Sequence, residues 1–435
     1  MLGALRATVE GLEEFLAMGA VEDRPIEQTL EGFAERARAG GISVFRVMAG
    51  WRLLNPQFAS SSLCWQQGEG LTIERFRQGE ALVSEDYKRS TIFALLNSDA
   101  TEMRHRLAGA NAPFEFPIFE RLAALGMTDY FMCLVAFGKQ APGGQPMVGT
   151  PKREVPGAGI VLSFASDREG GFTDEEVCAL KRLRYMLALA SRTALDSDMR
   201  QTLATTYLGR ATGARVLGGE IARGDGEVVD AIIWYCDLRG STALCERLGA
   251  QAYLPVLNDY FEATAGPVVK AGGEVLDFIG DAVLAIFPPT PEGFAGVLAG
   301  TKAACEEVMA LPGQHSALAD RTCLSDMTGI AIATGTVVYG NIGIAERLTF
   351  SVIGPTVNAV ARLEQLTKVL KEPLLVSADV AAQMEWDGGW RDLGAFALEG
   401  FSSDTHVFAP KMEPVGPAAQ ASSPSSKRST SAASM

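Results

Sequence analysis

The segment VLDFIGDAVLAIF, residues 275–287, places two acids in an otherwise apolar run. The apolar stretches on either side of Gly280 and Asp281 predict two strands joined by a hairpin turn. A carboxylate is costly to bury without a partner, so a sheet built from this hairpin must account for both Asp277 and Asp281. Gly-Asp also suits a hairpin turn for backbone reasons, which is an ordinary alternative for Asp281.

The length and the charge of the chain limit what surrounds this hairpin. A chain of 435 residues is too long for one typical core, so two domains with appendages are expected. A net charge of −14 argues against a broad nucleic-acid surface, although a nucleotide held with a metal ion remains compatible with it. No uncharged apolar run reaches the length of about 18 residues that a membrane span requires. We therefore expect a soluble, cytoplasmic protein with no membrane span and no nucleic-acid partner.

The cysteines are scattered along the chain. There are seven of them, without a C-x-x-C pair, so neither a disulfide framework nor a zinc spacing is present. We expect reduced thiols.

The N-terminal region predicts helices followed by strands. Residues 1–38 have helical spacing, and 41–56 predict a strand, a glycine turn and a second strand. Residues 130–137 and 157–166 predict core strands. Thr173 is expected to cap the long helix that follows. This layout resembles the GAF-like sensor modules of signalling proteins, which implies an α/β sensor domain at 1–195 with an unknown ligand.

The rest of the chain divides by composition. Residues 196–226 form a helical, Gly/Arg-rich connector, and a new block runs from 227 to 410. Residues 411–435 are rich in Ser, Ala and Pro without periodicity, so this tail is expected to be disordered.

The block 227–410 opens with a strand that ends in an acid. In VVDAIIWYCDLRGSTAL, Asp237 stands at the predicted strand end and Gly-Ser-Thr opens a helix. Free amides at a helix N-terminus attract phosphate, and a neighbouring carboxylate suits magnesium. An acid before a helix is equally typical of a simple cap.

A third motif lies in residues 328–366. Strands lead to IGPTVNAVARLE, a predicted helix on which Asn358 and Arg362 are four residues apart and share one face. A solvated face with a surface salt bridge is the ordinary alternative.

These three motifs, in this order and spacing, resemble the catalytic domain of the class III adenylate and guanylate cyclases. The resemblance implies a ferredoxin-like α+β fold, with an antiparallel sheet flanked by helices. It also implies two Mg²⁺ (or Mn²⁺) ions per active site held by Asp237 and Asp281, in a two-metal scheme. The phosphates are expected along the backbone of a short loop and near Arg347; the loop comprises Leu238, Arg239, Gly240, Ser241 and Thr242.

The resemblance also implies a homodimer with shared active sites. Asn358 matches the asparagine that orients the ribose, and Arg362 matches the arginine that stabilises charge at the α-phosphate. In the family these two residues come from the partner chain.

Two base-reading positions depart from the pattern of adenylate cyclases. Asp277 stands where those enzymes usually carry lysine, and Ser351 stands where they carry Asp or Thr. A carboxylate accepts hydrogen bonds from guanine, so Asp277 favours GTP, whereas the family as a whole favours ATP. Glu399 lies near a position that is often basic. The chain is therefore expected to cyclise ATP or GTP, and a catalytically silent, dimerising homologue is the alternative.

Overall fold

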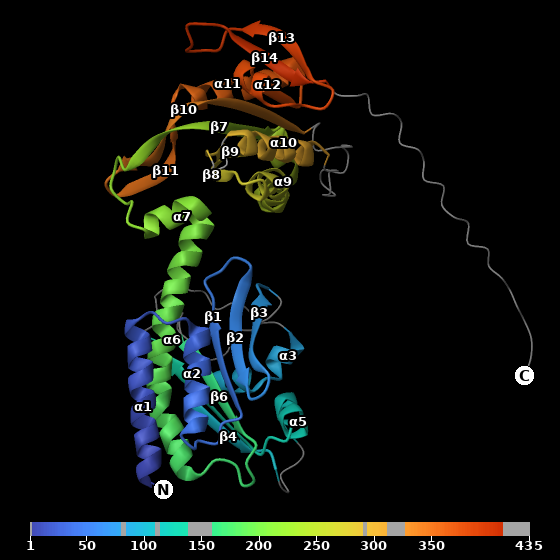
Figure 1. Ribbon diagram of the computed structural model, residues 1–435. Coiled ribbons are helices and arrows are strands. Elements are labelled where there is room, and N and C mark those ends of the chain that lie inside the picture. Colours follow the sequence, from blue (N-terminus) through green and yellow to red (C-terminus); the bar gives the residue numbers. More distant parts are fainter. Residues whose placement is uncertain are drawn as a thin grey trace, which may run out of the picture. The chain divides into compact units, whose positions relative to one another are not determined.

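The computed structural model describes residues 2–79, 84–108, 114–137, 159–289, 294–310 and 327–411. The chain divides into two compact units, Met1–Tyr207 and Leu208–Met435 (Figure 1). Residues 138–158, between the two predicted core strands, and all of the predicted tail except Lys411 lie outside the described residues. The three predicted boundaries, after residues 195, 226 and 410, follow composition and family resemblance, and they stay predictions.

The first unit is built around an antiparallel sheet with the strand order β3-β2-β1-β6-β5-β4. Its strands are β1 (Arg46–Arg52), β2 (Phe58–Gln66), β3 (Gly70–Arg77), β4 (Glu102–Arg106), β5 (Asp129–Ala136) and β6 (Gly159–Ser166). Its helices are α1 (Leu2–Val21), α2 (Ile26–Ala39), α3 (Glu85–Lys88), α4 (Thr91–Leu96), α5 (Pro117–Ala124) and α6 (Asp174–Leu208).

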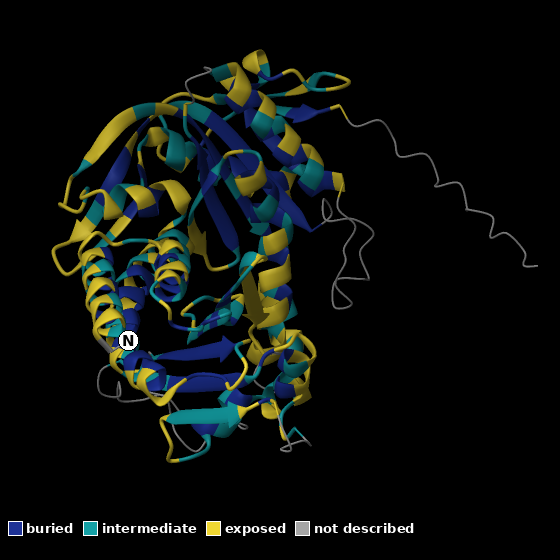
Figure 2. Ribbon diagram, turned by 60° about the horizontal axis from the view of Figure 1, so that its bottom comes forward, coloured by how far each residue is buried: buried dark blue, intermediate teal, exposed yellow. Residues whose placement is uncertain are grey.

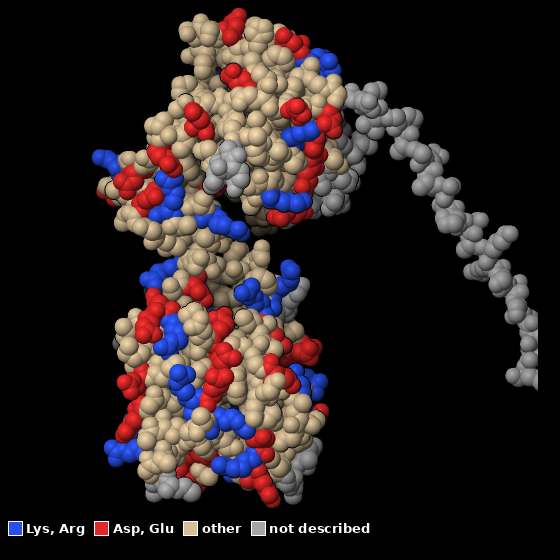
Figure 3. All heavy atoms as spheres, in the orientation of Figure 1, with Lys and Arg blue, Asp and Glu red and all other residues tan. Residues whose placement is uncertain are grey.

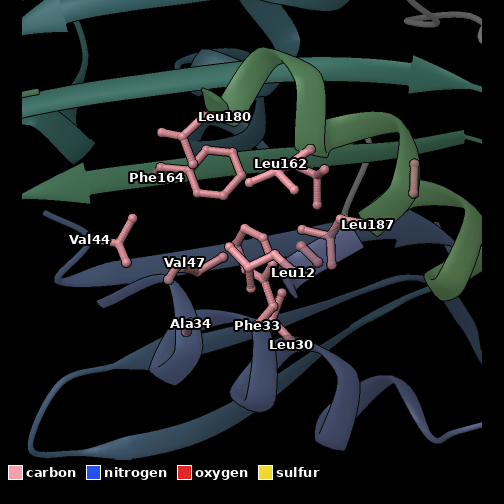
Figure 4. Packing of buried hydrophobic residues seen from close by; sticks show 14 of the residues in the cluster. Leu12, Leu30, Phe33, Ala34, Val44, Val47, Leu162, Phe164, Leu180 and Leu187 are labelled. Carbon is pink, nitrogen blue, oxygen red and sulfur yellow. The ribbon is translucent and has the colours of Figure 1, made fainter. Parts of the chain in front are cut away.

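Helices cover both faces of this sheet because its central strands are apolar on both sides. On β6, Leu162 and Phe164 point into a cluster with α1, α2 and α6, while Val161 and Ala165 point into a second cluster with α5. Figure 4 shows Leu162 and Phe164 among side chains from these three helices. The predicted strands at 130–137 and 157–166 are confirmed as β5 and β6.

The glycine turn predicted within 41–56 is wrong. Residues 46–52 form one continuous strand, in which Gly50 pairs with Ser62 on one side and with Val161 on the other. Hydrogen-bonded neighbours on both edges hold the chain extended there, which overrides the turn preference of glycine.

The second unit contains a larger sheet with the order β13-β14-β12-β10-β7-β9-β8, and β11 pairs with β10. Its strands are β7 (Gly226–Leu238), β8 (Glu274–Ile279), β9 (Ala282–Phe287), β10 (Thr328–Ile344), β11 (Arg347–Ile353), β12 (Leu374–Ser377), β13 (Trp390–Phe396) and β14 (Thr405–Pro410). Its helices are α7 (Arg210–Leu217), α8 (Ser241–Leu248), α9 (Ala250–Lys270), α10 (Phe294–Ala310), α11 (Pro355–Leu370) and α12 (Ala378–Gln383).

This second sheet also has helices on both faces. Trp234 of β7 lies in a cluster with α9 and α10, whereas its neighbour Ile233 lies in a cluster with α11. The pairs are antiparallel except for β10 with β12, which are parallel. The expected α+β architecture, a largely antiparallel sheet flanked by helices, is confirmed, as are the hairpin β8–β9 and the strand β7 before α8.

Burial and charge follow this layering. Central strands such as β6 and β9 are buried, whereas the edge strands β3, β8 and β13 are largely exposed or half-buried, and the outer sides of the helices are exposed (Figure 2). On the face visible in Figure 3, acidic and basic side chains alternate over the described parts of both units. None of the helices in the described ranges is long and apolar enough to cross a membrane.

The predicted cap at Thr173 is confirmed and gives a first test. The Glu176 amide donates to Thr173 Oγ1 at 3.2 Å, and the Thr173 amide donates to the Glu176 carboxylate at 2.7 Å. Thr173→Ala should therefore lower the free energy of unfolding of the first unit by about 1 kcal/mol. Urea unfolding measures the change. Thr206→Ala, an exposed position on the same helix, is the control, and an equal loss there would contradict the capping role.

Candidate active site

The structure brings Asp237 and Asp281 together at one end of the second sheet. Asp237 is the penultimate residue of β7 and pairs in register with Ala282, the residue after Asp281. Asp281 lies in the β8–β9 turn, where Gly280 has a φ of 67° that favours glycine. Both acids line an open cavity of about 530 Å³. The other lining residues are Leu238, Arg239, Gly240, Ser241, Thr242 and Lys368.

Asp281 is close enough to Asp237 to affect its ionisation. Burial raises the pKa of Asp237, and the negative charge of Asp281 raises it further, while a hydrogen bond from Lys368 opposes both effects. A second carboxylate beside a half-buried one is unfavourable unless positive charge is supplied.

The donor chemistry of this cavity fits a hard divalent cation. Carboxylate oxygens are preferred ligands of Mg²⁺, which keeps several ligands from water or phosphate. Among the residues that the structure describes, no group of three or more His, Cys, Asp or Glu could hold a metal ion. Asp237 and Asp281 are the two carboxylates that line the cavity and could hold such an ion, and the remaining positions would fall to water and to a ligand.

The loop between β7 and α8 lies along the same cavity. Gly240 has a φ of 73°, which lets the chain leave the strand and start the helix at Ser241. The guanidinium of Arg239 donates to the backbone oxygens of Thr367 at 3.2 Å and Glu372 at 2.6 Å. Its side chain therefore ties the loop to the end of α11. The phosphate contact predicted for Arg239 is through its backbone, and it stays a prediction.

Two further residues belong to this region although no role was predicted for them, Glu364 and Lys368. Lys368 Nζ donates to Asp237 Oδ2 and lies 3.7 Å from the Glu364 carboxylate. Glu364 is only 2% exposed, and burial raises its pKa to about 7, with Lys368 lowering it and Asp237 raising it. The only sequence signal was their i, i+4 spacing on a helix, which is also the spacing of an ordinary surface salt bridge.

Asn358 and Arg362 do not line this cavity. Both lie on α11, where Asn358 is exposed and Arg362 is half-buried. A guanidinium nitrogen of Arg362 is 3.6 Å from the Glu399 carboxylate. Arg362 precedes Lys368 by six residues, which corresponds to roughly 9 Å of rise and about 240° of rotation. When Lys368 reaches Asp237, Arg362 of the same chain therefore points elsewhere.

The predicted base-reading residues lie on two strands that contact each other. Asp277 is exposed on β8, next to a break in the strand register, and Ser351 on β11 pairs with Gly340. Arg347 is exposed at the start of β11. None of these three lines the cavity that holds Asp237. The predicted site residues thus form one cluster at the cavity and further positions outside it.

Comparisons with known proteins match most of the second unit to one family. Residues 227–400 match the family described as the adenylate and guanylate cyclase catalytic domain. Adenylate cyclase 2 from Rhizobium meliloti (strain 1021) is 30% identical over 233 residues, covering 52% of this chain and 60% of that protein. An adenylate cyclase from Anabaena cylindrica is 30% identical over 154 residues, covering 35% of this chain and 30% of that protein.

Among solved structures, a bacterial light-regulated adenylyl cyclase is similar with a TM-score of 0.43 at 18% identity, covering 59% of this chain and 83% of that one. The chain spans between 30% and 60% of the length of the two curated relatives.

The buried Glu364 predicts a pH-dependent contribution to stability. Its pKa of about 7 exceeds the ordinary 4.5, so the folded chain keeps a proton that the unfolded chain releases between these values. The stabilisation is full below pH 4.5 and is lost as the pH rises through 7. The free energy of unfolding of the wild type, relative to Glu364→Gln, should fall by roughly 3 kcal/mol over this range.

Urea unfolding in EDTA at a series of pH values measures this difference. Glu385→Gln, at an exposed acid, is the matched control, because solvent screens such a charge. A difference between the wild type and Glu364→Gln that stays constant with pH would contradict the assignment.

Proposed function

We propose that this chain, whose residues 227–400 belong to the adenylate and guanylate cyclase catalytic domain family, converts a nucleoside triphosphate into its 3′,5′-cyclic nucleotide and pyrophosphate. The observation that carries the proposal is the convergence of Asp237 and Asp281 on one open cavity beside the loop 238–242. In this reaction the 3′-oxygen bonds to the α-phosphorus, the bond to the pyrophosphate oxygen breaks, and the 3′-hydroxyl loses its proton.

Two divalent cations, Mg²⁺ or Mn²⁺, would supply the positive charge that stabilises the attacking and leaving oxygens. Asp237 and Asp281 would hold them. The charge balance of the described residues supports this role, since the ammonium of Lys368 that pairs with Asp237 is shared with Glu364.

The backbone of residues 238–242 would bind the phosphates. Its amides lie where β7 passes into α8, at the positive end of a helix dipole. Arg347, which is outside this cavity, is proposed as a further phosphate contact.

Asn358 and Arg362 would act in the site of a partner copy, with Asn358 orienting the ribose and Arg362 stabilising charge on the α-phosphate. The direction of Arg362, away from its own Asp237, supports a homodimer in which each site combines residues of both chains. Glu399 next to Arg362 would hold the guanidinium until a phosphate takes its place.

ATP is the proposed substrate, because the Rhizobium and Anabaena relatives are named adenylate cyclases. Asp277 favours GTP as the second candidate. Its exposed carboxylate lies on a strand that contacts the strand of Ser351, as two residues that read one base would require. The first unit is proposed as a GAF-like sensor whose ligand is unknown.

A direct assay tests the proposal against a catalytically silent homologue. Purified full-length protein is incubated with ATP or GTP in the presence of Mg²⁺ or Mn²⁺, and cyclic nucleotide is measured. Cyclic product from either nucleotide is expected. If neither nucleotide yields product, with dimerisation and metal binding verified, the chain is a silent dimerising module.

Mixing two inactive variants tests the shared site. Asp237→Ala removes a metal carboxylate and Arg362→Ala removes the partner's guanidinium, so each should lose at least about 100-fold in kcat. An equal mixture should recover roughly a quarter of the wild-type activity, because half the dimers are mixed and each has one intact site. No recovery in a verified heterodimer would contradict the chain assignment.

A change of charge at residue 277 tests base reading. Asp277→Lys should lower the ratio of kcat/KM for GTP to that for ATP by at least about tenfold, because a carboxylate accepts from guanine and an ammonium cannot. Steady-state kinetics with both nucleotides measure the ratio. Glu385→Lys makes the same change at an exposed position of the same unit, and an equal shift there would remove Asp277 from the base site.

A further inference from the structure

Lys368 is the basic residue whose charge reaches Asp237. It lines the cavity together with one other basic residue, Arg239, whose guanidinium is directed to backbone oxygens of Thr367 and Glu372. The ammonium of Lys368 instead donates to Asp237 Oδ2, the carboxylate proposed to hold a metal ion.

The fold is built to bring this ammonium to that carboxylate. Asp237 pairs across the sheet with Gly329 of β10. A Cβ at Gly329 would lie 2.2 Å from Thr367 Oγ1 and 2.7 Å from Glu364 Oε1, so only glycine lets α11 approach this closely. Lys368 follows Thr367 directly and extends from the packed helix toward the cavity.

A second acid holds Lys368 in place. The buried Glu364 carboxylate lies one helical turn earlier and 3.7 Å from Lys368 Nζ. It accepts a hydrogen bond of 3.5 Å from the Thr367 hydroxyl. Lys368 thus bridges one acid inside the fold and one acid at the cavity, while its side chain is still 45% exposed and able to move.

We infer that Lys368 is a tethered cation that competes with divalent metal for Asp237, so that metal binding must displace its ammonium. The inference rests on the proposed function for the identity of the metal carboxylates. An ammonium donating to Asp237 Oδ2 occupies an oxygen that the metal needs, and two cations at one carboxylate repel each other. Lys368 is a positioning residue in this view: it holds Asp237 ready and lowers the metal affinity of the chain without nucleotide.

Metal binding in the absence of nucleotide tests the inference without relying on turnover. Free Mn²⁺ is quantified by electron paramagnetic resonance during titration of the full-length protein at about pH 8, where carboxylates are ionised. Lys368→Gln should bind Mn²⁺ roughly tenfold more tightly than the wild type, since a charge-assisted bond no longer has to be broken. Lys368→Arg keeps the charge and should stay close to the wild type.

A matched control separates the direct contact of Lys368 with Asp237 from the general effect of removing one positive charge. Lys371→Gln removes one positive charge at the exposed C-terminal cap of the same helix. It should leave Mn²⁺ affinity within about twofold, because solvent screens an exposed charge. An equal increase of Mn²⁺ affinity in Lys371→Gln and Lys368→Gln would overturn the inference of competition. A long-range effect of charge would then explain the increase.

The remaining outcomes of the Mn²⁺ titration also decide whether the inference holds. Equal or weaker Mn²⁺ binding by Lys368→Gln overturns the inference and leaves the proposed function standing. No Mn²⁺ binding by Lys368→Gln in the absence of nucleotide also overturns the inference, and the cyclic-nucleotide assay then decides the proposed function separately. If Lys368→Gln fails to fold because Glu364 has lost this partner, the double variant Glu364→Gln, Lys368→Gln is compared with Glu364→Gln. The same increase of Mn²⁺ affinity is expected.

Discussion

The register of β7 between β9 and β10 is the constraint on which the site depends. Asp237 faces Ala282 on one side and Gly329 on the other. The first pairing brings the turn acid Asp281 alongside, and the second opens the space into which α11 packs. A slip of one residue would turn Asp237 to the opposite face of the sheet and separate it from both.

The acids at this cavity are balanced by less positive charge than the buried acid of the first unit. In the first unit, the fully buried Asp129 is balanced by Arg104 and Arg106 and accepts the Phe172 amide, so nothing further is needed. In the described part of the second unit, three acids act on the ammonium of Lys368, namely Asp237, Asp281 and Glu364. The other cation that lines the cavity, Arg239, donates to backbone oxygens. A cluster left short of positive charge costs stability and is typical of a site that recruits a cation with its ligand.

The helix α11 connects this cluster to the other predicted catalytic residues. Its C-terminal half places Lys368 on the acid of its own chain, and its N-terminal half carries Asn358 and Arg362 away from that acid. One rigid helix therefore serves two locations, and under the proposed function these locations are the two shared sites of a dimer. Any movement of α11 that releases Lys368 would also be felt by Arg362.

The sequence by itself determined the local features of this protein: the hairpin that bears Asp281, the strand that carries Asp237 near its end, and the cap at Thr173. Each depends on residues close together in the chain, where turn, cap and alternation rules apply. Only the tertiary structure decided that Gly50 lies inside a strand and that Lys368 reaches Asp237. The reason is that both features depend on the pairing of strands that are far apart in the sequence. No local sequence pattern predicts which of these strands pair.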